Sequence, residues 1–226
     1  MVELFHVWKQ YQKPFWALSD ISLSVKKGEF CFITGPSGSG KSTLLKLLYR
    51  EVLPTEGQII IGGKNILRLT NHKIYTLRRH MGIVFQDFRL MFHKRVFDNV
   101  AIALRVQGTP LRDMKRRAFI ALRMVNLQHK IWDYPTSLSY GEQQRVAIAR
   151  ALANDPSVIL ADEPTAALDS HRGRQVMELF RGVAHEHGAG VIVVTHDQRT
   201  LEVFDTIYEM EDGLIRQGTS QLSVAP

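Results

Sequence analysis

Cysteine and long apolar runs are scarce in this chain of 226 residues. The single cysteine, Cys31, excludes an internal disulfide, and its apolar neighbours predict a small buried side chain rather than a reactive thiol. No apolar run approaches the ~18–20 residues of a membrane-spanning helix; the longest, Val158–Ala161 and Val191–Val194, are the length of strands. The first residues lack the charged and apolar regions of a signal peptide. We therefore expect a cytoplasmic protein.

An excess of acidic residues is also absent, because 29 Lys and Arg against 22 Asp and Glu give a formal net charge of +7. Such a balance is typical of proteins that contact nucleic acid or an anionic membrane surface, and it also arises from scattered, solvated basic side chains. The densest clusters, Arg78-Arg79-His80 and Lys115-Arg116-Arg117, are too sparse for a nucleic-acid-binding arm. We expect scattered charge or a membrane surface, and no nucleic acid.

The spacing of apolar residues predicts an α/β protein with one large core and a helical insertion. The first third favours strands at Val2–Trp8, Ala17–Val25, Phe30–Thr34, Gln58–Ile61 and Gly82–Phe85. A period of 3.6 residues then predicts helices at Val96–Val106, Leu111–Asn126 and Gly141–Ala153. The last third alternates, with strands at Val158–Ala161, Gly190–Thr195, Thr206–Met210 and Leu214–Gln217, and helices at His171–His187 and near Gln198–Val203. Alternation of this kind indicates a parallel sheet with helical crossovers.

Residues 35–43 fit the pattern G-x-x-x-x-G-K-[ST] of a phosphate-binding loop, between the strand at Phe30–Thr34 and a predicted helix at Ser42–Arg50. Glycines let the backbone curl around an anion, and the N–H groups that start the helix favour negative charge. Lys41 can reach the β- and γ-phosphates, and the Ser42 hydroxyl can bind Mg²⁺. A glycine-rich turn is the plainer alternative, which the strand–loop–helix setting disfavours. The loop comprises Gly35, Pro36, Ser37, Gly38, Ser39, Gly40, Lys41, Ser42 and Thr43.

Two carboxylates, Asp162 and Glu163, follow the apolar strand at Val158–Ala161. A strand buried on both faces presents acids only at its carboxyl end, beside the phosphate loop. Asp162 would hold Mg²⁺ through water, and Glu163 would orient or deprotonate the attacking water. The alternative, two acids that simply begin a loop, is disfavoured once the phosphate loop is present.

The segment Leu138–Arg145 opens the periodic helix upstream of that strand. Ser139 is expected to cap the helix, with Glu142 three residues further on, as in a capping box. A second hypothesis is a further phosphate site, in which a hydroxyl and the first N–H groups of the helix face a γ-phosphate.

In their order, these motifs resemble the ATP-binding-cassette (ABC) family of nucleotide-binding domains along essentially the whole chain. The resemblance makes Gln86 the Q-loop glutamine, residues 138–143 the signature with Ser139, Gly141 and Glu142, and residues 166–169 the D-loop with Asp169. His196 matches the switch histidine, although a histidine after a buried strand is more often structural. Tyr11 matches the aromatic residue that stacks on adenine, and Phe15 and Trp16 lie close enough to compete for that role.

The resemblance implies a single domain, residues 1–226, with a P-loop NTPase (RecA-like) core of the ABC type, an N-terminal antiparallel β subdomain and an inserted helical subdomain. The core would comprise residues 1–86 and 154–226, and the helical subdomain residues 87–153. Two copies would pair head to tail with ATP between the phosphate loop of one and the signature of the other, so that binding closes the homodimer and hydrolysis opens it. ATP and Mg²⁺ are the implied cofactors, with Ser42, Gln86 and Asp162 at the metal and Glu163, His196 and Gln86 at the chemical step.

Two residues depart from the family pattern. Tyr140 stands where glycine is usual, which is tolerable if its backbone angles are helical or extended and doubtful if φ is positive. Ala166 replaces a common serine and removes one hydroxyl from the dimer interface. Neither change removes a catalytic group, so we expect activity.

Within the family, residues 85–100 look most like the cell-division ATPases of the FtsE type. That resemblance implies a transmembrane FtsX-type partner docked near residues 86–100, on a surface with Phe88, Leu90, Met91, Phe92, Val96 and Phe97, of which about half would pack the core. It also implies a place on the inner face of the plasma membrane and control of cell-wall hydrolases. The alternatives are an ATPase for lipoprotein release or macrolide export, a soluble ABC protein acting on ribosomes or DNA, and an ATP-gated binding module with negligible turnover.

Overall fold

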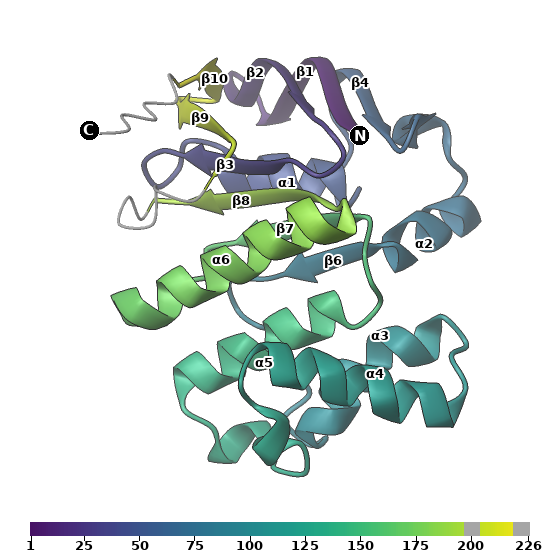
Figure 1. The fold of residues 1–226 in the computed structure, drawn as a ribbon. Coiled ribbons are helices and arrows are strands. Elements are labelled where there is room, and N and C mark those ends of the chain that lie inside the picture. Colours follow the sequence, from purple (N-terminus) through teal and green to yellow (C-terminus); the bar gives the residue numbers. More distant parts are fainter. Residues whose placement is uncertain (197–203, 219–226) are drawn as a thin grey trace.

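The computed structural model describes residues 1–196 and 204–218, which form two sheets and a set of helices (Figure 1). The helix expected near Gln198–Val203 lies outside the described residues. The first sheet is antiparallel, with the order β2-β1-β4-β5. Its strands are β1 (Val2–Gln12), β2 (Phe15–Val25), β4 (Glu56–Ile61) and β5 (Lys64–Asn65).

The second sheet is parallel except at one edge, with the order β10-β9-β3-β8-β7-β6. Its strands are β3 (Phe30–Thr34), β6 (Met81–Val84), β7 (Val158–Asp162), β8 (Gly190–Thr195), β9 (Thr206–Glu211) and β10 (Leu214–Gln217). The carboxyl ends of β3, β7 and β8 therefore meet at one edge of the sheet. The phosphate loop follows β3 at this edge, and Asp162 and Thr195 are the last residues of β7 and β8.

Alternate side chains of β3 enter two different cores, as the period of a strand requires. Cys31 and Ile33 join the cluster between the two sheets, which also takes up the apolar face of α1 (Lys41–Leu48). Phe30 and Phe32 join the cluster on the other face, with α5 (Tyr140–Leu152) and α6 (Ser170–His187). Cys31 is fully buried, as the sequence predicts, and burial raises the pKa of its thiol well above the usual value.

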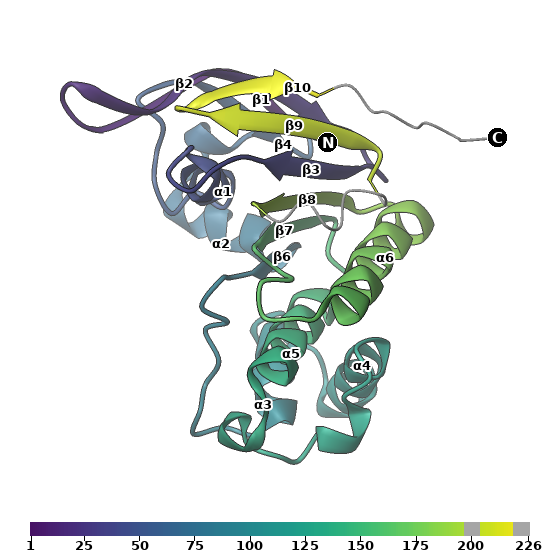
Figure 2. The same ribbon diagram turned by 90° about the vertical axis from the view of Figure 1, so that its left-hand side faces the viewer.

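Three helices, α3 (Val96–Val106), α4 (Leu111–Met124) and α5, pack together below the parallel sheet in Figure 1. Short 3-10 turns at Ile66–Arg68, Gln128–Lys130 and Pro135–Ser137 complete the connections. Figure 2 shows the hairpin between β1 and β2 extending beyond the body of the protein. The predicted α/β architecture is confirmed.

The sequence-based prediction departs most from the structure in two places. It assigns no element to residues 71–79, which form α2 (Asn71–Arg79); Ile74 is the only buried residue of this helix, so the apolar stripe is too thin to recognise. It also ends the first strand at Trp8 and begins the second at Ala17, whereas both run on to the hairpin at Lys13-Pro14 with exposed residues. None of the helices in the described part of the chain is long and apolar enough to cross a membrane.

Candidate nucleotide site

The phosphate loop curls between β3 and α1 at a point where side chains have no room. Gly35 has φ +151°, and a Cβ there would lie 2.0 Å from the carbonyl oxygen of Met210. Gly40 has φ +106°, and its Cβ would lie 2.6 Å from the carbonyl oxygen of Ala17. Both positions therefore require glycine, because a left-handed backbone and a close neighbour each exclude a side chain.

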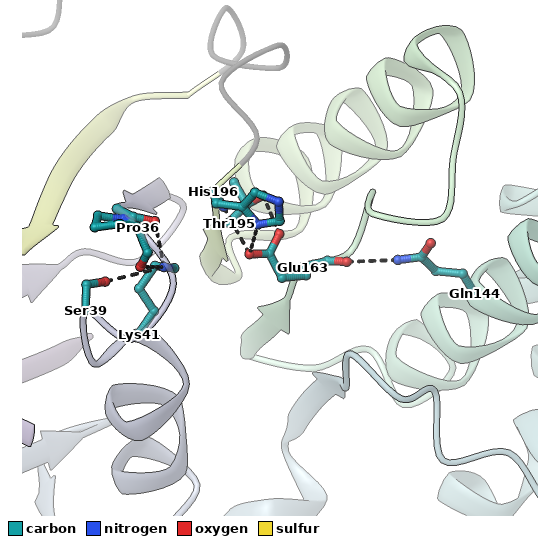
Figure 3. Close-up of polar contacts among 8 residues, drawn as sticks. Pro36, Ser39, Lys41, Gln144, Glu163, Thr195 and His196 are labelled. Carbon is teal, nitrogen blue, oxygen red and sulfur yellow. Dashed lines mark hydrogen bonds and ion pairs between the residues drawn. The ribbon is translucent and has the colours of Figure 1, made fainter.

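Lys41 lies buried beneath this loop and holds it from within. Its Nζ donates to the carbonyl oxygens of Gly35 and Pro36 at 2.7 Å each, and contacts Ser39 Oγ at 3.4 Å (Figure 3). Burial lowers the pKa of Lys41, while the carboxylates of Glu163 and Asp162 oppose that shift. The loop thus surrounds a cation with two acids in its field.

A cavity of about 480 Å³ brings the predicted phosphate loop together with four residues that are distant in sequence. These are Gln86, Asp162, Glu163 and His196, as the sequence analysis predicted. The lining from the loop side comprises Ala17, Pro36, Ser37, Gly38, Gly40, Lys41, Ser42 and Thr43.

Asp162 is the last residue of β7 and stands beside the start of α1. Burial raises the pKa of this carboxyl, a hydrogen bond with the Ser42 side chain opposes the shift, and the neighbouring Glu163 adds to it. A half-buried carboxylate and a hydroxyl in contact form an oxygen donor pair, which is the chemistry that hard cations prefer.

Glu163 is buried and its carboxylate is held at both oxygens. Oε2 accepts from Thr195 Oγ1 at 2.6 Å, and Oε1 accepts from the His196 backbone N–H at 3.0 Å. The ring nitrogen Nδ1 of His196 lies 2.7 Å from the same Oε1 (Figure 3). Glu163 also has φ +49°, a left-handed conformation that is uncommon for a residue with a side chain. The carboxylate is therefore fixed in direction at the carboxyl edge of the sheet.

Gln144, which the sequence analysis did not single out, fixes the backbone around Glu163 from the opposite side. It is 1% exposed, and its Nε2 donates to the Glu163 carbonyl oxygen at 3.1 Å (Figure 3). Its Oε1 accepts from the Ala167 N–H at 3.2 Å, which places the D-loop in the same network. Its amide therefore joins α5 to both the acidic pair and the D-loop.

The signature residues begin α5, away from the lining of the cavity. Ser139 Oγ accepts from the Glu142 N–H at 3.4 Å, and Glu142 Oε2 accepts from the Ser139 N–H at 2.8 Å, which confirms the capping box. Tyr140 is the first residue of the helix and has no positive φ, so the condition set for tolerating a bulky residue there is met. A Cβ on Gly141 would lie 3.1 Å from a Leu168 methyl, so the D-loop packs against the signature.

Asp169 and Tyr11 also stand apart from the cavity lining within one copy of the chain. Asp169 caps α6, where its side chain accepts from the Arg172 N–H at 2.9 Å. Tyr11 lies on the exposed hairpin and is 53% exposed, with Lys9 Nζ 4.8 Å above its ring. Phe15 and Trp16 on the same hairpin are exposed too, so this geometry does not choose among the three aromatic residues.

Most of the apolar side chains predicted to dock a partner belong to the core. Phe88, Leu90, Val96 and Phe97 are buried, whereas Met91 is half-buried and Phe92 is 51% exposed. Two exposed aromatic residues that sequence reasoning missed, Trp132 and Tyr134, lie in a loop whose carbonyls accept from the start of α3. We call the exposed aromatic residues Phe92, Trp132 and Tyr134, together with the half-buried Met91 next to Phe92, the aromatic rim.

The family model for ABC transporters matches residues 18–166 of the chain. The chain belongs to the ABC family. It is 40% identical to the cell division ATP-binding protein FtsE of Bacillus subtilis, over 98% of this chain and 97% of that protein. It is 44% identical to the FtsE of Mycobacterium tuberculosis, over 89% and 88%, and 38% identical to the methionine import ATP-binding protein MetN of Carboxydothermus hydrogenoformans, over 88% of this chain and 59% of that one.

Solved ABC cassettes share the fold. A dimeric structure of the cassette MJ0796 has a TM-score of 0.90 and 38% identity, covering 96% of this chain and 98% of that one. A second dimeric structure of MJ0796, in a post-hydrolysis state bound to ADP and phosphate, has a TM-score of 0.91. The chain is therefore an ABC-type ATPase that binds adenine nucleotide, with the P-loop core predicted for it.

Proposed function

We propose that this ATPase is the nucleotide-hydrolysing subunit of a membrane complex of the cell-division type, with an FtsX-like transmembrane partner. The observation that carries the ATPase part is the single cavity that joins Lys41, Asp162, Glu163 and His196. The cell-division part rests on relatives named FtsE that match nearly the whole chain at 40–44% identity.

The phosphate loop, residues 35–43, binds the phosphates of ATP through its backbone N–H groups and Lys41. Lys41 Nζ already donates to two carbonyl oxygens of the loop, so it exchanges weak neutral acceptors for charged phosphate oxygens. The loop also presents the amino end of α1, where negative charge is favoured. Tyr11 stacks on the adenine ring from the hairpin.

The residues present fit a magnesium ion, because the Asp162 carboxylate and the Ser42 hydroxyl are already in contact at the edge of the cavity. Ser42, Gln86 and Asp162 would hold it, and the ion would neutralise charge on the phosphates. Among the described residues, no cluster of three His, Cys, Asp or Glu side chains suggests a site of another kind.

Glu163 orients the attacking water and accepts its proton as general base, and His196 holds the Glu163 carboxylate in place. Three donors converge on the two carboxylate oxygens, so the base does not have to be ordered when substrate arrives. Gln86 lies on the same cavity wall, where its amide can hold the water or a magnesium ligand and pass the state of the site to the segment that follows it.

Closure of a head-to-tail homodimer completes the site. In one copy, Ser139, Gly141, Glu142 and Asp169 do not line the cavity with the phosphate loop, so a second copy would supply them across the interface. The exposed amino end of α5 then faces the γ-phosphate, where a helix start favours an anion. Dimeric structures of the related MJ0796 cassette support the formation of a dimer.

The aromatic rim is the proposed docking surface for the transmembrane partner, on the cytoplasmic face of the membrane. Exposed aromatic residues gathered on one surface mark interaction sites more often than scattered ones do. His93, Lys94 and Arg95 lie among these residues, and the Arg95 guanidinium sits 5.1 Å from the Tyr134 ring. The surface therefore fits an apolar partner segment that carries acidic side chains.

Recruitment of a Phe92→Asp variant to membranes tests the proposed docking surface. A charge at the rim should abolish co-purification with membranes that contain the partner and produce filamentous cells, with ATP binding unchanged. Leu111→Asp, at a comparably exposed residue of α4, is the matched control and should be recruited normally. Normal recruitment of Phe92→Asp would contradict the docking surface, and a defect confined to lipoprotein or drug export would favour the transport alternative.

A further inference from the structure

Phe88 and Arg89 form a turn with an unusual backbone, two residues after Gln86. Their φ angles are +58° and +48°, in the left-handed region that bulky residues rarely adopt. Phe88 is nevertheless 4% exposed, so the turn holds a large side chain inside the protein. A conformation of this kind persists only where the surroundings hold it in place.

The first hold on this turn comes from the carboxyl half of α5. Arg150 Nη2 donates to the Phe88 carbonyl oxygen at 2.6 Å, and Nη1 donates to the Arg89 carbonyl oxygen at 2.7 Å. Burial and repulsion from Arg89 lower the pKa of Arg150 to about 10, so the guanidinium stays charged at neutral pH. Hydrogen bonds from a charged donor are roughly twice as strong as neutral ones.

The second hold comes from the first residue of the same helix. The Tyr140 ring lies against the Phe88 ring, with centroids 4.5 Å apart and planes at 56°. Tyr140 is 61% exposed, so it is the outer member of the pair and covers Phe88 from solvent. Glycine, which is usual in the family pattern at this position, would supply no ring.

We propose that Tyr140 is a positioning residue that ties the turn at Phe88 and Arg89 to the amino end of α5. A displacement of the turn is then carried to Ser139 and Gly141 of the same copy, which flank Tyr140. Arg150 and Tyr140 hold the turn at points ten residues apart on α5, so turn and helix move as one body. The consequence for catalysis rests on the proposed dimer, in which these signature residues close on nucleotide.

Hydrogen exchange in the monomer tests the tie directly. Tyr140→Ala should speed amide exchange in residues 86–90 by about 2- to 10-fold, the range expected for one aromatic pair. Tyr140→Phe keeps the ring and should exchange like the native chain. Tyr75→Ala removes a tyrosine of similar exposure from α2 and is the control. Unchanged exchange in Tyr140→Ala would overturn the proposal.

ATP-driven dimerisation, measured by sedimentation in a Glu163→Gln background, tests whether the tie positions the signature. Tyr140→Ala should raise the ATP concentration at half-dimerisation by about 2- to 10-fold, with the affinity of one copy for a fluorescent ATP analogue unchanged. Tyr140→Phe should restore dimerisation. In a Phe88→Leu background, Tyr140→Ala should add nothing, because residues that act through each other are not additive.

Three outcomes would overturn the positioning role. The first is an equal effect of Tyr140→Ala on dimerisation with and without Phe88→Leu. The second is a Tyr140→Phe variant that dimerises as weakly as Tyr140→Ala, and the third is a Tyr140→Ala variant that dimerises like its parent. If the Glu163→Gln parent does not dimerise with ATP, the proposed dimer fails, and the exchange experiment still decides whether the turn and the helix are tied.

Discussion

Replacement of Gln144 by methionine would separate support of the site from support of the fold. Methionine matches the length of glutamine but cannot form the two hydrogen bonds of the Gln144 side-chain amide. The Ala167 N–H therefore loses its acceptor, and the Glu163 carbonyl loses one donor. That carbonyl keeps the Ala166 N–H at 3.3 Å. The expected loss of stability is about 2–4 kcal/mol, from one unsatisfied donor and one lost neutral bond.

In a thermal melt, this loss corresponds to a decrease of roughly 4–16 °C in the melting temperature of a chain of this size. ATP turnover should fall by about tenfold with little change in KM, because the backbone of Glu163 loosens while the phosphate loop stays intact. Gln144→Glu keeps an acceptor for the Ala167 N–H and loses the donor to the Glu163 carbonyl. Comparison of the two variants therefore distinguishes the contributions of the two hydrogen bonds. Gln107→Leu, which loses one exposed hydrogen bond to the Arg79 carbonyl, is the control.

A Gln144→Met variant that melts early but turns over at the native rate would refute the positioning of Glu163 by this amide. A variant unchanged in both respects would refute the network altogether. The two hydrogen bonds end at two points of one loop, residues 163–169, so turnover reports on the backbone of the base itself.

The remaining predictions concern the other parts of the site. Lys41→Ala should abolish tight binding of ATP with Mg²⁺ in calorimetry, and unchanged affinity would contradict its role. Tyr11→Ala should weaken binding by about 1–3 kcal/mol if this ring stacks on the base, and an equal loss in Phe15→Ala instead would move the role to Phe15. The hydrogen bond from the Ser139 backbone N–H holds the pKa of Glu142 below its usual value. The stabilisation by Glu142 is therefore complete above pH ~4.3 and fades as pH falls through the lowered pKa. In urea unfolding, the difference in unfolding free energy between the native protein and Glu142→Gln should shrink between neutral and acidic pH.

The fold could be predicted from the sequence where a local pattern is strong. The strands β3, β7 and β8, which are buried along almost their whole length, and the phosphate loop carry their own signals, because strand burial and the glycine requirement act within a few residues. The helix α2 buries only Ile74, so no stripe marks it. The hairpin ends of β1 and β2 are exposed, and their composition does not distinguish strand from loop.

The site could be predicted where family motifs mark it, and not where the contacts join distant segments. Asp162, Glu163 and His196, which the motifs predict, line the same cavity as the phosphate loop. Gln144 and Thr195 were missed, because a buried amide 19 residues before Glu163 and a hydroxyl 32 residues after it have no sequence signal of their own. Tyr134 and Trp132 were missed for the same reason, since only the fold brings their loop to the start of α3.

The central claim is that Glu163 is the base of an ATPase that works as an ATP-bound dimer, and Glu163→Gln tests it most directly. The amide keeps the shape of the side chain and can still meet the Thr195 hydroxyl and the His196 N–H. Sedimentation and turnover should be measured together, with and without ATP. We expect turnover to fall by ~100-fold or more and a stable dimer to form only with ATP. Hydrolysis at the native rate, or a variant that stays monomeric with ATP, would contradict the account.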